Sequence, residues 1–242
     1  IISTTFLIYT FWYLNKMSKI NININKLIDL NKLKNIFNIN LNIFIRTILL
    51  TFSFFWFTYL GSQIGEDYIA ANAILINLVF LSAFILDAYA FSTEGMVGYS
   101  LGKKDISLFK KIVKNSFILS TLTGLIISII YFFINNYVIT LMSDIESIRN
   151  LSSSYAVWLI LMPLISSFCY QFDGIFIGAS QTKELRNAMI FSVFSYLLMS
   201  LYLTKLIGNT GIWISLSLFM VLRALSLFYY LDKIYLRFRT GK

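Results

Sequence analysis

Long apolar runs alternate with short polar segments along most of this chain. The apolar runs cover residues 1–14, 41–60, 70–102, 112–134, 154–180, 188–206 and 211–231. An α-helix rises 1.5 Å per residue, so about 20 apolar residues cross a hydrocarbon core of about 30 Å. The first run reaches only about 21 Å on this scale. The pattern therefore predicts one truncated transmembrane helix followed by six complete ones.

The composition supports a membrane protein. Hydrophobic residues make up 58% of the 242 residues and charged residues only 13%, which is too apolar for a soluble domain of this length. We therefore predict an all-α, polytopic transmembrane helix bundle. The net charge of +9 does not indicate nucleic-acid binding, because the Lys and Arg residues lie in the gaps between apolar runs rather than along one stripe.

The positions of these basic residues predict the topology. Sixteen lie in four alternate segments: Lys16, Lys19, Lys26, Lys32, Lys34; Lys103, Lys104, Lys110, Lys111, Lys114; Lys183, Arg186; Lys233, Arg237, Arg239, Lys242. The loops on the opposite side hold two, Arg149 and Lys205. Because cytoplasmic loops carry the excess of Lys and Arg, this alternation places the linker and the C-terminus in the cytoplasm.

The chain is predicted to comprise four parts. These are 1–14, the remnant of a transmembrane helix; 15–40, a cytoplasmic linker; 41–231, six helices; and 232–242, a cytoplasmic tail. The chain begins with Ile and lacks the basic start and cleavage site of a signal peptide, so we expect it to be the later part of a longer protein.

The linker has its own helical pattern. Leu27, Leu30, Leu33 and Phe37 recur at helical spacing opposite the lysines, which predicts a short helix lying on the membrane surface.

The residue types available restrict the chemistry. There is no His, and the single Cys169 lies within an apolar run. Zinc sites, disulfides, Cys/His nucleophiles and histidine proton relays are therefore excluded, and we expect no metal site and no cofactor. Any proton or cation chemistry must use carboxylates.

The helix from residue 70 carries two such carboxylates. Asp87, Phe91, Glu94 and Gly98 follow the spacing i, i+4, i+7, i+11 and share one face, with the acids about 10 Å apart along the axis. Ionisable groups at membrane depth are costly, so this face either lines a substrate or cation pathway or pairs with polar neighbours in the bundle.

Glycine and proline mark packing or hinge positions. Gly95, Gly98 and Gly102 permit close helix approach near the cytoplasmic end of that helix. Pro163 removes the backbone hydrogen bond to the carbonyl of Leu159, which predicts a kink that is either static or a hinge.

Three further charged residues lie inside spans. Asp173 is followed by Gly174 and Gly178, a small-xxx-small pair, and either belongs to the cation pathway or pairs with an arginine. Arg223, near the middle of the last span, needs an acidic partner such as Asp87 or Asp173. Arg46, near the start of its span, is expected to extend to the membrane interface and is a second candidate charge partner.

Two stretches together resemble a known family. The segments ANAILINLVFLSAFILDAYAFSTEGMVGYSLGKKD and FDGIFIGASQTKELRNAM are similar to the second lobe of multidrug and toxic compound extrusion (MATE) transporters. With IFIRT at 43–47, FDGIFIGAS resembles the branch named for the DNA-damage-inducible protein F.

The resemblance implies a twelve-helix transporter of two six-helix lobes in the bacterial inner membrane, of which this chain holds the C-terminal lobe. It implies export of small amphipathic or cationic substrates in exchange for H⁺ or Na⁺, with the missing N-terminal lobe as the partner. In this branch the coupling carboxylates lie in the first lobe, and the span 41–60 lacks the acid that some relatives carry on helix seven.

Three alternatives remain open at this point. A flippase for lipid-linked precursors would share the architecture but needs a strongly cationic cavity, whereas only Arg46 and Arg223 are intramembrane cations. An intramembrane aspartyl protease would place Asp87 and Asp173 on facing helices with one shared proton, but Asp173 does not follow a Gly-x-Gly motif. The chain could also be a purely structural membrane subunit.

Overall fold

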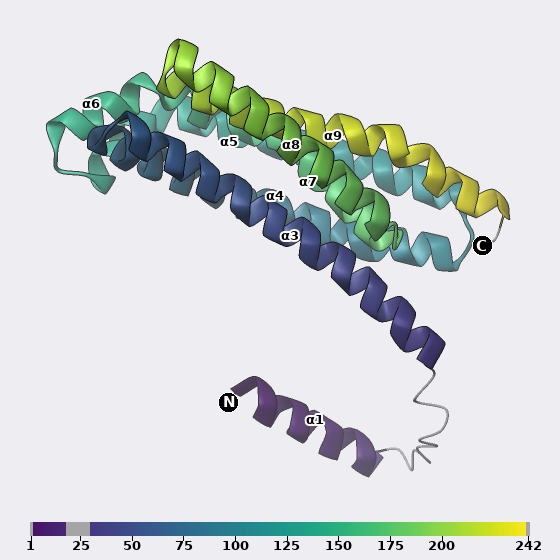
Figure 1. Cartoon of the computed structure of the whole chain (residues 1–242). Helices are drawn as coiled ribbons and strands as arrows, with labels where there is room; N and C mark the ends of the chain where they lie inside the picture. Colours follow the sequence, from purple (N-terminus) through teal and green to yellow (C-terminus); the bar gives the residue numbers. More distant parts are fainter. Residues whose placement is uncertain (1, 18–29, 241–242) are drawn as a thin grey trace. The chain divides into compact units, whose positions relative to one another are not determined.

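A computed structural model describes residues 2–17 and 30–240, and within these ranges the regular structure is α-helical (Figure 1). The helices are α1 (Ile2–Met17), α3 (Leu30–Ile64), α4 (Glu66–Gly102), α5 (Ile106–Met142), α6 (Glu146–Ser154), α7 (Ala156–Gly178), α8 (Thr182–Ile207) and α9 (Asn209–Thr240). Six of them, α3, α4, α5, α7, α8 and α9, are long and apolar enough to cross a membrane. The chain is a multi-pass membrane protein.

The chain divides into two units, Ile1–Asn40 and Leu41–Lys242. The first unit contains α1, whose 16 residues reach about 24 Å. The second unit contains the helix bundle and all the residues of the site.

The linker differs from its prediction. Instead of a separate surface helix, α3 begins at Leu30 and continues without a break to Ile64. This stretch contains no proline, and its first glycine is Gly61, so no residue stops the helix before it becomes apolar. Leu27 lies outside the described residues.

The helix ends also differ from the ends of the apolar runs. The acidic pair Glu66 and Asp67, in the polar gap between the runs 41–60 and 70–102, forms the first turn of α4, where carboxylates complement the helix dipole. The segment 232–242, predicted as a tail, continues α9 as far as Thr240. The nine-residue helix α6 was not predicted, because it is short and polar.

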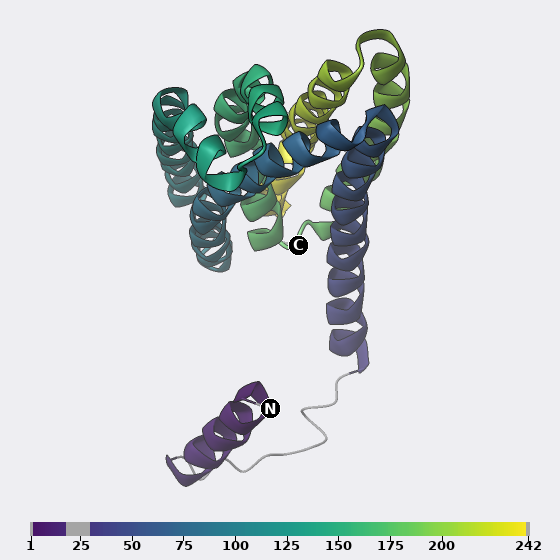
Figure 2. The same ribbon diagram turned by 90° about the vertical axis from the view of Figure 1, so that its left-hand side faces the viewer.

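α7 lies at the centre of the bundle. It packs against α4, α5 and α9, and the arrangement of the helices around it is visible in Figure 2. All eight residues from 169 to 176 are buried. A helix that is buried on every side belongs to the core of a bundle, so polar groups on this stretch need partners within the protein.

Two glycines of α7 set its distance from α4. A Cβ atom built on Gly174 would lie 2.3 Å from the carbonyl oxygen of Ala90, and one built on Gly178 would lie 2.4 Å from that of Glu94. The two backbones therefore touch where the small-xxx-small pair was found, as is typical of close helix crossings in membranes.

The glycines of α4 differ in how closely other helices approach them. A Cβ on Gly98 would meet the carbonyl oxygen of Gly178 at 3.5 Å, an ordinary contact. Gly95 and Gly102 have no such neighbour within 4 Å among the described residues, so their role in close helix packing stays a prediction. Both lie on the exposed side of α4.

Pro163 lies inside α7, which continues through it. Its carbonyl faces Gly124 of α5, where an added Cβ would approach to 2.9 Å. The proline is therefore part of a close contact between α5 and α7. Its role as a hinge stays a prediction.

A polar network joins α4 to α9. Asn72 donates to the Oδ1 atom of Asn209 at 2.6 Å and accepts from its Nδ2 atom at 3.0 Å. The indole Nε1 of Trp213 donates to Asn72 Oδ1 at 2.9 Å. All three residues are buried, so each hydrogen bond satisfies a group that has no access to water.

Candidate functional site

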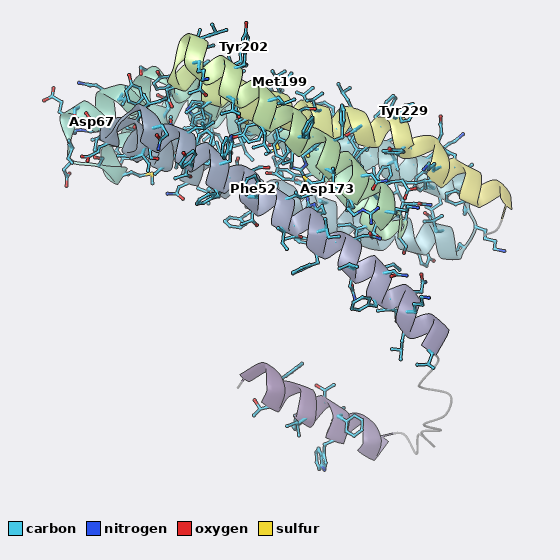
Figure 3. The ribbon with its side chains drawn as sticks, viewed as in Figure 1. Phe52, Asp67, Asp173, Met199, Tyr202 and Tyr229 are labelled. Carbon is cyan, nitrogen blue, oxygen red and sulfur yellow. The ribbon has the colours of Figure 1, made fainter. Side chains whose placement is uncertain are left out.

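Asp173 is the acceptor of two arginines from different helices. Its Oδ2 atom accepts hydrogen bonds from Nη2 of Arg223 on α9, at 2.6 Å, and from Nη2 of Arg46 on α3. Figure 3 shows Asp173 about midway along the bundle, with Asp67 near one end. One carboxylate on the central helix therefore joins α3, α7 and α9.

Burial makes this arrangement energetically important. Arg223 is 1% exposed and Asp173 is 5% exposed, whereas Arg46 is half-buried. Arg46 thus bonds to an acid inside the bundle, and the expectation that it extends to the interface is wrong. Breaking one partner of a buried ion pair typically costs about 3–5 kcal/mol, because a charge is left without compensation.

Asp87 completes a four-residue charge cluster. It lies on α4, is half-buried, and is close enough to interact electrostatically with Asp173, Arg46 and Arg223. None of the described residues donates a hydrogen bond to its carboxylate. With both acids ionised, the two carboxylates balance the two guanidinium groups, and neutralising Asp87 leaves the cluster with one excess positive charge.

Glu94 lies outside this cluster. Its backbone packs against Gly178, and its side chain is half-buried without an ion pair to any residue that the structure describes. Two turns separate it from Asp87 along α4, as the spacing predicts.

The cluster retains unused hydrogen-bonding capacity. Buried polar atoms without a partner in the described ranges include Nε of Arg46, Nε of Arg223, Oδ1 of Asp173 and Nε2 of Gln171. Gln171 accepts from the hydroxyl of Thr93 at 2.9 Å, which extends the polar region along the α4–α7 contact. Sequence reasoning missed Gln171 and Thr93, although a glutamine two residues before Asp173 in an apolar helix was an available signal.

The exposed side of α4 carries small residues among large ones. Ala88, Ser92, Gly95, Gly98 and Gly102 are exposed there, and so are Leu81, Phe84, Ile85, Phe91, Met96 and Tyr99. In contrast, the exposed side of α5 carries large aliphatic residues: Ile118, Leu119, Leu122, Leu125, Ile126, Ile129 and Ile130. Small residues are enriched where membrane helices meet, so the small positions of α4 allow another helix to approach closely.

Six membrane-length helices around a buried charge cluster define a membrane-embedded helical bundle with a polar centre. Comparison with known proteins gives its family. The MatE family model matches residues 43–206, and the chain belongs to this family. The family consists of membrane transporters.

One curated relative is DNA damage-inducible protein F of Escherichia coli K12, which is 33% identical over 189 residues. The match covers 78% of this chain and 41% of that protein. The chain therefore spans less than half the length of this relative.

Solved structures share the fold. A MATE in complex with MaD3S has a TM-score of 0.82 at 15% identity, with 99% of this chain and 54% of that chain covered. The Vibrio cholerae MATE transporter VcmN in the bent form has a TM-score of 0.76 at 17% identity, with 89% and 48% covered.

Proposed function

We propose that this chain forms one lobe of a secondary active exporter that exchanges small amphipathic or cationic compounds for H⁺ or Na⁺. The observation that carries the proposal is the difference between the two central acids. Asp173 is held by Arg46 and Arg223, whereas Asp87 lies beside the same cluster without a described hydrogen-bond donor. Asp87 is thus the carboxylate available to a cation.

The exchange follows from the charge balance of the cluster. When Asp87 is ionised, a cationic substrate or Na⁺ gains a partner at membrane depth. When Asp87 is protonated, the excess charge of the two arginines repels a cation. Proton and substrate therefore compete for one group, which is the requirement for antiport. Alternating access would come from rocking of this lobe against a second lobe.

The second lobe has a place to bind. The small residues on the exposed side of α4 allow the close helix approach that joins lobes within a membrane. Asp87 and Glu94 lie along the same helix, so a partner lobe docked there would close a cavity over both acids. The positive-inside pattern supports a cytoplasmic C-terminus in the bacterial inner membrane.

The alternatives receive less support. A flippase for lipid-linked precursors needs free cationic groups, but both intramembrane arginines bond to Asp173. An aspartyl protease needs the carboxyl groups of Asp87 and Asp173 to face each other and share one proton, but Asp173 bonds to the guanidinium groups of Arg46 and Arg223 instead.

The test is transport by the full-length gene product in everted membrane vesicles, with a fluorescent organic cation and an imposed H⁺ or Na⁺ gradient. We expect Asp87→Asn to lower gradient-driven transport while the amount of folded protein stays unchanged. Asp67→Asn is the matched control, because Asp67 is exposed in the first turn of the same helix. Normal transport by Asp87→Asn would remove this acid from the mechanism.

Asp173→Asn separates coupling from structure. Since Asp173 holds three helices together, we expect this variant to lose transport together with folded protein. A well-folded Asp173→Asn protein without transport would instead assign the coupling role to Asp173.

A further inference from the structure

An apolar groove runs between α5 and α9, with α7 as its floor. Its volume is about 670 Å³, and its lining is Phe117, Leu164, Ile165, Phe168, Phe172, Val221, Ala224, Leu225 and Phe228. This size falls within the range of about 300–1,000 Å³ that ligand pockets have. The groove is distinct from the charge cluster, since Phe172 lines it whereas the neighbouring Asp173 bonds to the arginines.

Aromatic rings define the walls of the groove. Phe172 on the floor makes edge contacts with Phe117 of α5, at a centroid distance of 4.9 Å, and with Phe228 of α9, at 6.3 Å. Nearer the start of α5, beyond the residues that line the groove, the ring of Phe109 packs against Tyr235 at 5.5 Å and Phe238 at 5.1 Å, so α5 and α9 are in direct contact there.

The rim of the groove carries large apolar side chains. Its α5 wall continues into the exposed aliphatic surface of α5, and its α9 wall exposes Val221, Leu225 and Phe228. A hydrocarbon chain is the ligand that matches an apolar lining at this depth in the membrane.

Two lysines lie on the same face of α5 as the groove residue Phe117. Lys110, Lys114 and Phe117 follow the spacing i, i+4, i+7 and share one face of α5, so the two lysines lie one and two turns beyond the aromatic wall. The ammonium of Lys110 is 5.9 Å from the ring centroid of Tyr235 on α9. No acidic side chain in the described part of the chain forms an ion pair with either lysine.

We propose that the groove is a binding site for an anionic phospholipid of the leaflet at the lysine-rich end of the bundle. One acyl chain lies against Phe117, Phe168 and Phe172, and the phosphate contacts Lys110 and Lys114. Basic pockets between transmembrane helices bind anionic headgroups in this way. The lipid stabilises α9 against α5 through a gap that the protein itself leaves unfilled.

The first experiment is native mass spectrometry of the full-length gene product in nanodiscs that contain equal amounts of phosphatidylglycerol and phosphatidylcholine. We expect the unmodified protein to retain phosphatidylglycerol preferentially. Leu225→Trp fills the groove, and Lys110→Gln with Lys114→Gln removes the headgroup contacts. Both changes are expected to lower retained phosphatidylglycerol several-fold.

Matched controls separate the site from general effects. Ile126→Trp adds the same bulk on the opposite side of α5, and Lys103→Gln with Lys104→Gln removes two charges from the end of α4. Both controls should retain phosphatidylglycerol as the unmodified protein does. Equal retention in all variants, or retention without headgroup preference, would overturn the proposal.

Photocrosslinking identifies the occupant directly. We expect p-benzoylphenylalanine in place of Phe168, which is 42% exposed in the groove, to form an adduct with phospholipid. A crosslink to another part of the protein or to a second copy would show that a helix fills the groove. That result, or the absence of any adduct, would refute the lipid site.

Discussion

Asp173 of α7 accepts a hydrogen bond at 2.6 Å from Arg223 of α9, and both side chains are almost completely buried within apolar spans. Arg46 of α3 bonds to the same Oδ2 atom. Three helices that are far apart in the sequence therefore share one acceptor atom.

Arg223→Met should lower the free energy of unfolding by about 3–5 kcal/mol, because it leaves a buried carboxylate with only one cationic partner. The double variant Asp173→Asn with Arg223→Met should cost less than the sum of its parts, since both buried charges are removed together. Thermal unfolding followed by size-exclusion chromatography measures both effects. Lys205→Met, an exposed control, should stay within about 0.5 kcal/mol, and strictly additive losses would contradict the coupling.

Gly174→Ala should destabilise the protein by about 1–3 kcal/mol, since the new methyl group would lie 2.3 Å from the carbonyl oxygen of Ala90 and must push α7 away from α4. Gly95→Ala is the matched control, because nothing lies within 4 Å of its Cβ position. This control should be neutral or slightly stabilising, because alanine favours helices over glycine and is still small enough for the helix contact proposed at this surface. A harmless Gly174→Ala change would mean that the two backbones are not in contact.

Asn72→Leu should cost about 1–3 kcal/mol, because the amide of Asn209 and the indole nitrogen of Trp213 lose buried partners. Asn77→Leu lies on the exposed side of the same helix and should have little effect on the unfolding midpoint. Intrinsic tryptophan fluorescence offers a second measurement, because Asn72→Leu changes the surroundings of Trp213, one of the four tryptophans, whereas Asn77→Leu does not. Equal behaviour of the two variants would rule out the network as a source of stability.

Cys169 should react very slowly with a membrane-permeant maleimide, since its side chain is completely buried in α7. Denaturant should expose it, and Arg223→Met should raise the labelling rate because α9 is then held less firmly against α7. Mass spectrometry of the peptide that contains Cys169 measures the labelled fraction. Rapid labelling of the unmodified protein would show that the bundle opens at this level.

The spans were predictable because each depends on its own residues. Six apolar runs predicted six membrane helices, and α3, α4, α5, α7, α8 and α9 correspond to them. The ends were less accurate, as in α9, which continues beyond the apolar run while its exposed side becomes charged. Helix ends depend on capping and on neighbouring packing, which hydrophobicity does not report.

The candidate site was predictable only as a set of residues. Asp87, Asp173, Arg46 and Arg223 are conspicuous because charges are rare within apolar spans. Which acid each arginine contacts was left open, and Arg46 was expected at the interface. Asp173 and Arg46 are 127 positions apart, so no local pattern connects them.

The amino-acid sequence by itself therefore determined the membrane class, the six spans and the asymmetric distribution of basic residues. Transfer of a helix into hydrocarbon depends on the residues of that helix alone, so these features need no knowledge of its neighbours. Only the tertiary structure decided that Asp173 joins three helices while Asp87 has no described donor, and that Gly174 rather than Gly95 sets the contact between α4 and α7. Those outcomes depend on how each helix is rotated and where it crosses the next, which results from packing of the whole bundle.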